Sequence, residues 1–235
     1  GFERQVGYFN VESGDWEGVH GVVEGEEEGT IINDGVLCGN GVLFGTKDVE
    51  FKDPKAGLSL WLPGMETAKH LRGGQTCSNG KVIISREGKL YLLDIDTPTR
   101  VVVEYPLDLG NQVLGEPRTV VDLREAGAFP DGMVITPDGQ SVLVAMYNPE
   151  DVEAGEARQH SLGNGGLETV WKTPGSPRVT CPLLAEIGGE VVLLLTTAVE
   201  HMTEEEQARH PNAGCLFRAA TPFKGIEAAV WPDVP

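Results

Sequence analysis

Three short segments combine an Asn or Asp side chain with a glycine, and each precedes a strand-like run that a hairpin turn joins to a second one. The central residues are separated by 46 and 52 positions, which is typical of one four-stranded blade of a β-propeller. The segments are Asn33-Asp34-Gly35, Ser78-Asn79-Gly80 and Pro130-Asp131-Gly132.

The innermost strands of a propeller begin around the same end of its central channel, so equivalent positions in successive blades converge there. We therefore expect the side chains of Asn33, Asn79 and Asp131 to meet at one end of the channel. A fourth equivalent position falls at Val179-Thr180-Cys181, because Thr180 follows Asp131 by 49 residues, although its residue types depart from the other three segments.

Two amides and one carboxylate would offer hard oxygen donors with a single negative charge. Such a set suits Ca²⁺ or a similar divalent ion that prefers oxygen ligands. Each segment is also an ordinary turn sequence, and one alone would be read as a turn. Their repetition at blade spacing favours a metal site.

The chain is predicted to be all-β and to form a single propeller domain over residues 1–235. Turn sequences at Gly39-Asn40-Gly41, Arg86–Lys89 and Pro137–Gln140 predict three hairpins. Residues Thr203–Arg209 begin with a Thr-x-x-Glu capping box and predict a short helix in a loop.

The order and spacing of these segments resemble the senescence marker protein 30 / gluconolactonase / luciferin-regenerating family over almost the whole chain. The segments that carry the resemblance are Ile32–Gly35, Gly45-Thr46, Cys77–Gly80, Phe129–Met133, Thr196–Ala198 and Pro211–Phe217.

The resemblance implies a six-bladed β-propeller with one divalent ion in its channel, usually Ca²⁺ and in some members Zn²⁺ or Mn²⁺. The family binds this ion with a Glu, two Asn and an Asp, and Asn33, Asn79 and Asp131 match three of them. The Glu belongs to an N-terminal Gly-Glu-x-Pro-like segment that this sequence does not contain. Because Gly1 aligns with the second blade of the family, the first blade is expected to be absent or incomplete.

The activity that the resemblance implies is metal-dependent hydrolysis of a lactone or related small ester. The ion would polarise the carbonyl, and Asp131 would act as ligand and as general base or nucleophile. The alternative is a non-catalytic propeller that binds a ligand or partner and keeps Ca²⁺ as a structural clamp.

Contacts with substrate are expected from Asn33, Glu50 and His201. Glu50 falls near a family position that contacts substrate hydroxyls, and His201 lies in the loop after the last long strand. Sugar lactonases of the family carry an Arg two residues before the first Asn, where this chain has Ile31. The identity of the substrate therefore does not follow from the resemblance.

The formal net charge is −18, which disfavours nucleic acid as a partner because the field of the protein would repel phosphates. The longest apolar run, Val191–Val199, is shorter than a membrane span and predicts a buried strand. No membrane partner is expected. The expected partner is a small-molecule lactone or ester substrate, and the protein is expected to be a monomer or a dimer. With no signal segment in the sequence, a cytoplasmic location is favoured over a secreted or periplasmic one.

Overall fold

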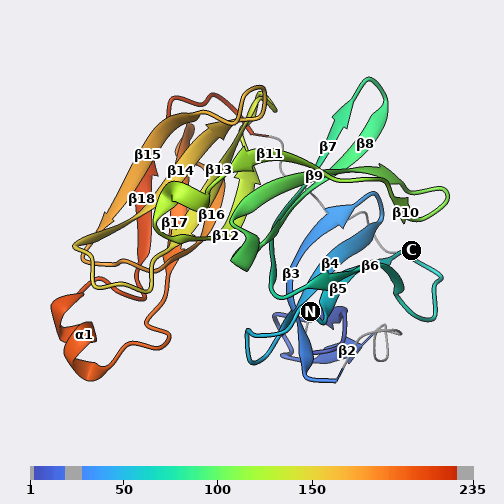
Figure 1. The fold of residues 1–235 in the computed structure, drawn as a ribbon, viewed down its shortest axis with the longest axis horizontal. Coiled ribbons are helices and arrows are strands. Elements are labelled where there is room, and N and C mark those ends of the chain that lie inside the picture. The colour runs from blue at the N-terminus through green and yellow to red at the C-terminus, as the bar shows by residue number, and fades with distance from the viewer. Residues whose placement is uncertain (1–2, 19–27, 227–235) are drawn as a thin grey trace. The chain divides into compact units, whose positions relative to one another are not determined.

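In a computed structural model, the described residues, 3–18 and 28–226, form an all-β fold of antiparallel sheets (Figure 1). Four sheets follow one another along the chain, and each is built from consecutive strands, as in the blades of a propeller. We number them blade 1 to blade 4. The predicted all-β propeller is confirmed, with four blades in the described part of the chain against the six of the family type.

Blade 1 contains four strands in the order β3-β4-β5-β6, and a two-residue turn at Gly39-Asn40 joins the first two. Gly39 has a φ of 62°, a left-handed conformation that glycine adopts without steric cost. The predicted hairpin is confirmed. The strands are β3 (Thr30–Cys38), β4 (Gly41–Asp48), β5 (Ala56–Trp61) and β6 (Lys69–Gln75).

Blade 2 follows the order β10-β9-β8-β7, and β11 also pairs with β9. Its first hairpin closes between Arg86 and Lys89, as the sequence predicted. A 3₁₀ turn, Thr97–Thr99, follows β8, and another, Arg124–Ala126, follows β11. The strands are β7 (Ser78–Arg86), β8 (Lys89–Asp96), β9 (Val101–Asp108), β10 (Val113–Leu114) and β11 (Arg118–Asp122).

Blade 3 has four strands in chain order and blade 4 has three. Blade 3 consists of β12 (Phe129–Ile135), β13 (Ser141–Tyr147), β14 (Ala154–Ser161) and β15 (Leu167–Pro174). Blade 4 consists of β16 (Val179–Ile187), β17 (Glu190–Thr197) and β18 (Leu216–Ala220). The turn between Ile135 and Ser141 confirms the third predicted hairpin.

Two smaller elements complete the description. The N-terminal hairpin pairs β1 (Gly7–Phe9) with β2 (Trp16–Gly18). Helix α1 (Glu204–Arg209) lies in the loop between β17 and β18, and its N-cap Thr203 and Glu206 form the predicted capping box. No helix in residues 3–18 and 28–226 is long and apolar enough to cross a membrane.

The described residues divide into two compact units. Unit 1 contains the residues up to Pro98 and Tyr105–Pro117, and unit 2 contains Thr99–Glu104 and the residues from Arg118 onward. In unit 2, the alternating side chains of β13, β16 and β17 pack blade 3 on blade 4, with fully buried Leu143, Val179 and Leu193 at the centre. A cluster that includes Phe44, Trp61 and Val6 is buried in unit 1.

The first strand of every blade contains a β-bulge at a corresponding position. The register shifts between Ile32 and Asp34, between Asn79 and Val82, between Pro130 and Met133, and between Val179 and Cys181. The segments that sequence analysis placed upstream of these strands therefore lie inside them. A bulge changes the direction in which the side chains at that point of the strand project. The side chains at these four bulges therefore do not follow the regular alternation of the sheet.

Candidate functional site

The bulges of blades 1 and 2 bring two asparagine side chains into contact in unit 1. Nδ2 of Asn33 donates to Oδ1 of Asn79 at 2.8 Å and to the carbonyl oxygen of Ser78 at 3.0 Å. The pairing of Lys47 with Cys77 and the bond from the Asp48 amide to the Thr76 carbonyl hold the end of β4 against the start of β7. Backbone structure therefore fixes the place where the two amides meet.

The amide of Asn79 is held from its other side as well. Its Nδ2 donates to Oγ1 of Thr97 at 2.9 Å and lies 3.6 Å from Sγ of Cys77. With the nitrogen engaged there, Oδ1 faces Asn33. Asn79 is buried, so a hydrogen-bonded, fixed amide is what its environment requires.

The amide pair suits an oxygen-seeking cation better than a thiolate-seeking one. Oδ1 of Asn79 points toward Asn33, and a half-turn of the Asn33 amide would place a second oxygen beside it. Neutral amide oxygens are common ligands of Ca²⁺. Within residues 3–18 and 28–226 no group of three or more His, Cys, Asp and Glu gathers as a metal site.

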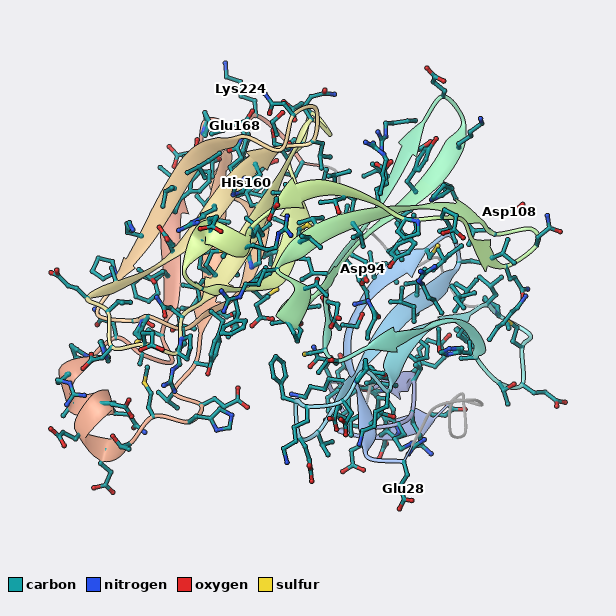
Figure 2. The ribbon with its side chains drawn as sticks, in the orientation of Figure 1. Glu28, Asp94, Asp108, His160, Glu168 and Lys224 are labelled. Carbon is teal, nitrogen blue, oxygen red and sulfur yellow. The ribbon has the colours of Figure 1, made fainter. Side chains whose placement is uncertain are left out.

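A buried ion pair lies directly behind Asn79. Nζ of Lys81 is 3.3 Å from Oδ1 of Asp94, and both side chains are fully buried. Lys81 also donates to the carbonyl oxygen of Asn79, while Asp94 accepts from Gln75 at 2.6 Å and from Ser78 at 3.2 Å. Asp94 lies inside unit 1, in contrast to the exposed Asp108 (Figure 2). This network ties the bulge of β7 to strand β8.

In unit 2, Asp131 stands in the bulge of blade 3, beside the first strand of blade 4. Its neighbour Gly132 leaves no room for a side chain, because an added Cβ would lie 2.8 Å from the carbonyl oxygen of Thr180 and 2.9 Å from Cα of Cys181. Blade 3 can therefore approach blade 4 only with glycine at this position. The bulges that carry Asp131 and Thr180 are brought together by this close approach.

Polar groups surround the Asp131 end of blades 3 and 4. Burial raises the pKa of Tyr147; the cation of Arg178 opposes this shift, and the charges of Glu200 and Asp131 reinforce it. The hydroxyl of Tyr147 donates to the carbonyl oxygen of Glu200 at 3.4 Å, and Arg178 donates to the same carbonyl. Tyr147, Arg178 and the Glu200 carbonyl form a polar cluster within unit 2, and the charge of Asp131 acts on Tyr147 from nearby.

The two predicted substrate contacts outside the bulges are exposed. Glu50 lies just beyond β4 and pairs with Lys52 at 2.9 Å, while Asp48 binds the backbone amide of Glu50 and shapes this loop. His201 follows β17, adopts a left-handed φ of 58° and lies 3.7 Å from Glu200. Asn33 and Asn79 lie together in unit 1, and Asp131 and His201 belong to unit 2.

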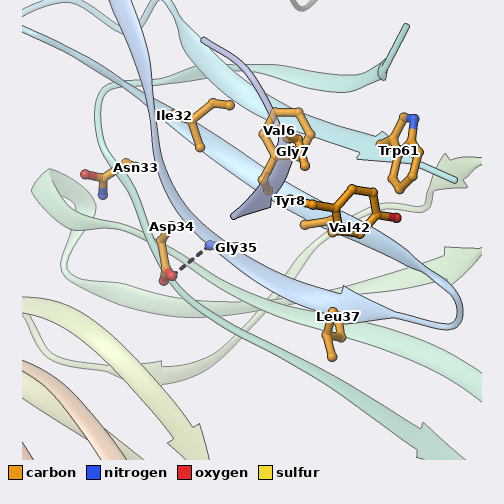
Figure 3. A pocket seen from close by; sticks show the side chains of 11 residues that line it. Val6, Gly7, Tyr8, Ile32, Asn33, Asp34, Gly35, Leu37, Val42 and Trp61 are labelled. Carbon is orange, nitrogen blue, oxygen red and sulfur yellow. Dashed lines mark hydrogen bonds between the residues drawn. The ribbon is translucent and has the colours of Figure 1, made fainter. Parts of the chain in front are cut away.

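A pocket of about 520 Å³ opens beside Asn33 in unit 1. Asn33 and Asp34 border one side, and apolar groups that include Tyr8, Val42 and Trp61 line the other (Figure 3). The carboxylate of Asp34 accepts from the amide of Gly35 at 2.7 Å. The pocket therefore joins an apolar surface to one of the two contacting asparagines.

Three features of the site were missed from sequence: Lys81 with Asp94, Thr97, and Arg178. Lys81 is two residues after Asn79, and Arg178 is two residues before Thr180. These positions beside the repeated segments were the only sign in the sequence that the two residues belong to the site. Their burial depends on strands far away in sequence and could not be read from this spacing.

Comparison with known proteins decides the family. The sequence profile of the SMP-30/Gluconolactonase/LRE-like region matches residues 1–199. The chain belongs to this family. A protein of Sulfolobus acidocaldarius without an assigned function is 28% identical over 184 residues, which are 78% of this chain and 60% of that protein. The bulged strands at Asn33, Asn79 and Asp131 all lie inside the matched region.

Two further members carry names that refer to lactones. The Bacillus subtilis protein named "Putative sugar lactone lactonase YvrE" is 29% identical over 57% of this chain and 43% of its own length. The L-arabinolactonase of Azospirillum brasilense is 27% identical over the whole of this chain and 74% of its own length. The chain thus spans less than two thirds of the first two relatives.

Two solved structures share the fold. The calcium-binding protein regucalcin of Agrobacterium tumefaciens superposes with a TM-score of 0.77 at 17% identity, over 97% of this chain and 74% of its own. A luciferin-regenerating enzyme gives a TM-score of 0.78 at 20% identity, over 97% and 75%. At these identities the likeness establishes the family propeller fold.

Proposed function

We propose that this family member is a metal-dependent hydrolase of a lactone or related small ester, acting as one propeller domain over residues 1–235. The observation that carries the proposal is the bulge shared by the first strands of all four blades. Two of these bulges hold asparagine side chains 2.8 Å apart, and a third holds a carboxylate. The lactonase names of two relatives support the reaction class.

The proposed ligands are Asn33, Asn79 and Asp131. The first two supply neutral amide oxygens, and Asp131 supplies the negative charge that hard divalent cations prefer. Ca²⁺ is the proposed ion, with Zn²⁺ or Mn²⁺ as substitutes, and the calcium-binding description of regucalcin is consistent with this choice. Thr97 keeps Oδ1 of Asn79 directed toward Asn33, which prepares the amide for a ligand role.

When bound, the ion supplies Lewis acidity that polarises the substrate carbonyl and lowers the pKa of water. The carboxylate of Asp131 accepts a proton from the attacking water. The water oxygen bonds to the carbonyl carbon, and the ring C–O bond breaks. Asp131 passes the proton to the ring oxygen, which becomes a hydroxyl group, and the carboxylate of Asp131 is restored. The new carboxylic acid releases one proton to solvent, so each turnover yields a hydroxy-acid anion and H⁺.

Asn33, Glu50 and His201 are the proposed contacts for substrate. The apolar pocket beside Asn33 offers space for the carbon skeleton of a small ring, and Glu50 and His201 lie in exposed loops that can accept or donate hydrogen bonds to hydroxyl groups. The polar cluster around Tyr147 places further donors near Asp131.

The test is a pH-stat assay of proton release from a panel of lactones, with Ca²⁺, Zn²⁺ or Mn²⁺ added and with a chelator. We expect turnover that the chelator abolishes, and a loss of at least about 100-fold in kcat/KM for Asp131→Asn. Asp122→Asn, which removes an exposed carboxylate of the same unit, should retain activity. Equal rates for Asp131→Asn and the unmodified protein would refute the proposed role.

A further inference from the structure

Arg178 is a buried cation at the end of blade 4. The residue directly precedes β16 and is 4% exposed. Its guanidinium donates to the carbonyl oxygens of Glu200 and, at 3.4 Å, Pro149, and it lies 5.8 Å from the ring centroid of Tyr147. Two loops, one after β13 and one after β17, are thus held by a single side chain.

Arg178 forms no ion pair within the described part of the chain, although its charge, after the hydrogen bonds from Thr203, helps to lower the pKa of the Glu206 carboxyl group. No carboxylate of residues 3–18 and 28–226 lies within 4.0 Å of its guanidinium, and Nε is buried with no hydrogen-bond acceptor. By contrast, the buried Lys81 pairs with Asp94, and the partly buried Arg158 pairs with Glu156. Because an unpaired buried charge is costly, such a group is characteristic of a site that receives an anion.

The position of Arg178 places it in the candidate site. It precedes the bulge residue Thr180 by two positions, and Thr180 packs against Gly132, the neighbour of Asp131. Tyr147 forms a backbone bridge with Arg178 and pairs with Phe129, two residues before Asp131, so these segments lie at the same end of blades 3 and 4. A ligand bound at Asp131 would therefore lie at the end of blades 3 and 4 that also carries the guanidinium.

We infer that Arg178 makes this end of unit 2 a carboxylate-binding subsite, and that the substrate class is lactones that carry or generate a carboxylate next to Asp131. The inference rests on the proposed hydrolase. A guanidinium binds a carboxylate through charge-assisted hydrogen bonds, which the neutral carbonyl partners of Arg178 leave incomplete. The carboxylate is either a substituent of the lactone or the group that hydrolysis creates.

The first measurement is calorimetric binding of D-gluconate and of its neutral amide to the metal-loaded protein. We expect the anion to bind at least tenfold more tightly than the amide. Arg178→Met should reduce that ratio to twofold or less, while Arg178→Lys, which keeps the charge, should retain a ratio above threefold. Arg158→Met is the matched control and should leave the ratio unchanged. A ratio near one in the unmodified protein overturns the inference without any variant.

The second measurement separates the two sources of the carboxylate. A loss of kcat/KM in Arg178→Met that is confined to D-glucaro-1,4-lactone, with D-glucono-1,4-lactone unaffected, assigns the site to a carboxylate of the substrate. Weaker product inhibition with both lactones assigns it to the carboxylate formed by hydrolysis. Tighter binding of the anion without turnover of any lactone would refute the proposed hydrolase and support the anion site. Turnover without tighter binding of the anion would refute the carboxylate subsite and leave the proposed hydrolase in place.

Discussion

Removing one partner of the Lys81–Asp94 pair should destabilise the protein strongly. At 3.3 Å and an effective dielectric constant of about 20, the attraction between the two charges is about 5 kcal/mol. Both side chains are fully buried, so a lone survivor would keep its desolvation penalty and lose this attraction. We expect Asp94→Asn to lower the free energy of unfolding by about 3 to 5 kcal/mol, and the melting temperature by about 6 to 20 °C.

The double variant Lys81→Met/Asp94→Asn provides the discriminating comparison. It contains neither charge. The amide oxygen that replaces one carboxylate oxygen can accept from Ser78, and Gln75, whose Oε1 has no partner, can turn its amide to accept from the new Nδ2, so the stability should lie within about 1 kcal/mol of the unmodified protein. Urea denaturation of the four proteins gives the coupling free energy. Lys52→Met, which breaks the exposed pair with Glu50, should change stability by less than about 0.5 kcal/mol.

The pH dependence of Lys81→Met adds an independent check. Burial raises the pKa of Asp94 and Lys81 opposes that shift, so the variant should raise it further. A carboxyl group whose folded pKa exceeds its unfolded value stabilises the fold below the unfolded pKa and loses this contribution as pH rises through the folded one. Lys81→Met should therefore gain stability on acidification relative to the double variant. Additive single effects, with no coupling, would refute a buried ionic pair.

Two further predictions concern other buried groups. Burial lowers the pKa of His160, so its contribution to stability is complete above the unfolded value of about 6.5 and is lost as pH falls below it. The free energy of unfolding should therefore fall on acidification by at most about 1.4 kcal/mol per pH unit, and His160→Gln should lack this dependence. Equal pH slopes for the two proteins in urea titrations would contradict this. Burial raises the pKa of the Cys38 thiol to about 11, so iodoacetamide at a pH of about 8 should label the exposed Cys181 and Cys215 and reach Cys38 only after unfolding, as peptide mass spectrometry would show.

The sequence predicted the features that depend on local chemistry. Gly39-Asn40 and Thr203 with Glu206 act through bonds to residues a few positions away, so the hairpin and the capped helix could be located closely. The all-β propeller followed from the repeated spacing. The convergence of Asn33, Asn79 and Asp131 on one ion stays a prediction.

Features that depend on distant strands could not be read in the same way. The bulges require a partner strand to define a register, and the sequence placed Asn33 and Asp131 ahead of the strands that contain them. The burial of Lys81 follows from packing against β8, and that of Arg178 from two loops that fold over it. A lysine or arginine in an isolated sequence is expected at the surface.

The repeated bulge also bears on how such a protein can change its chemistry over evolution. The irregularity belongs to the backbone, and it is present whether the residue there is Asn33, Asp131 or Thr180. Exchanging one of these side chains should leave the strand pairing intact while altering what the site can recognise. Families built on this scaffold can therefore explore new substrates through a few interchangeable positions, with little risk to folding.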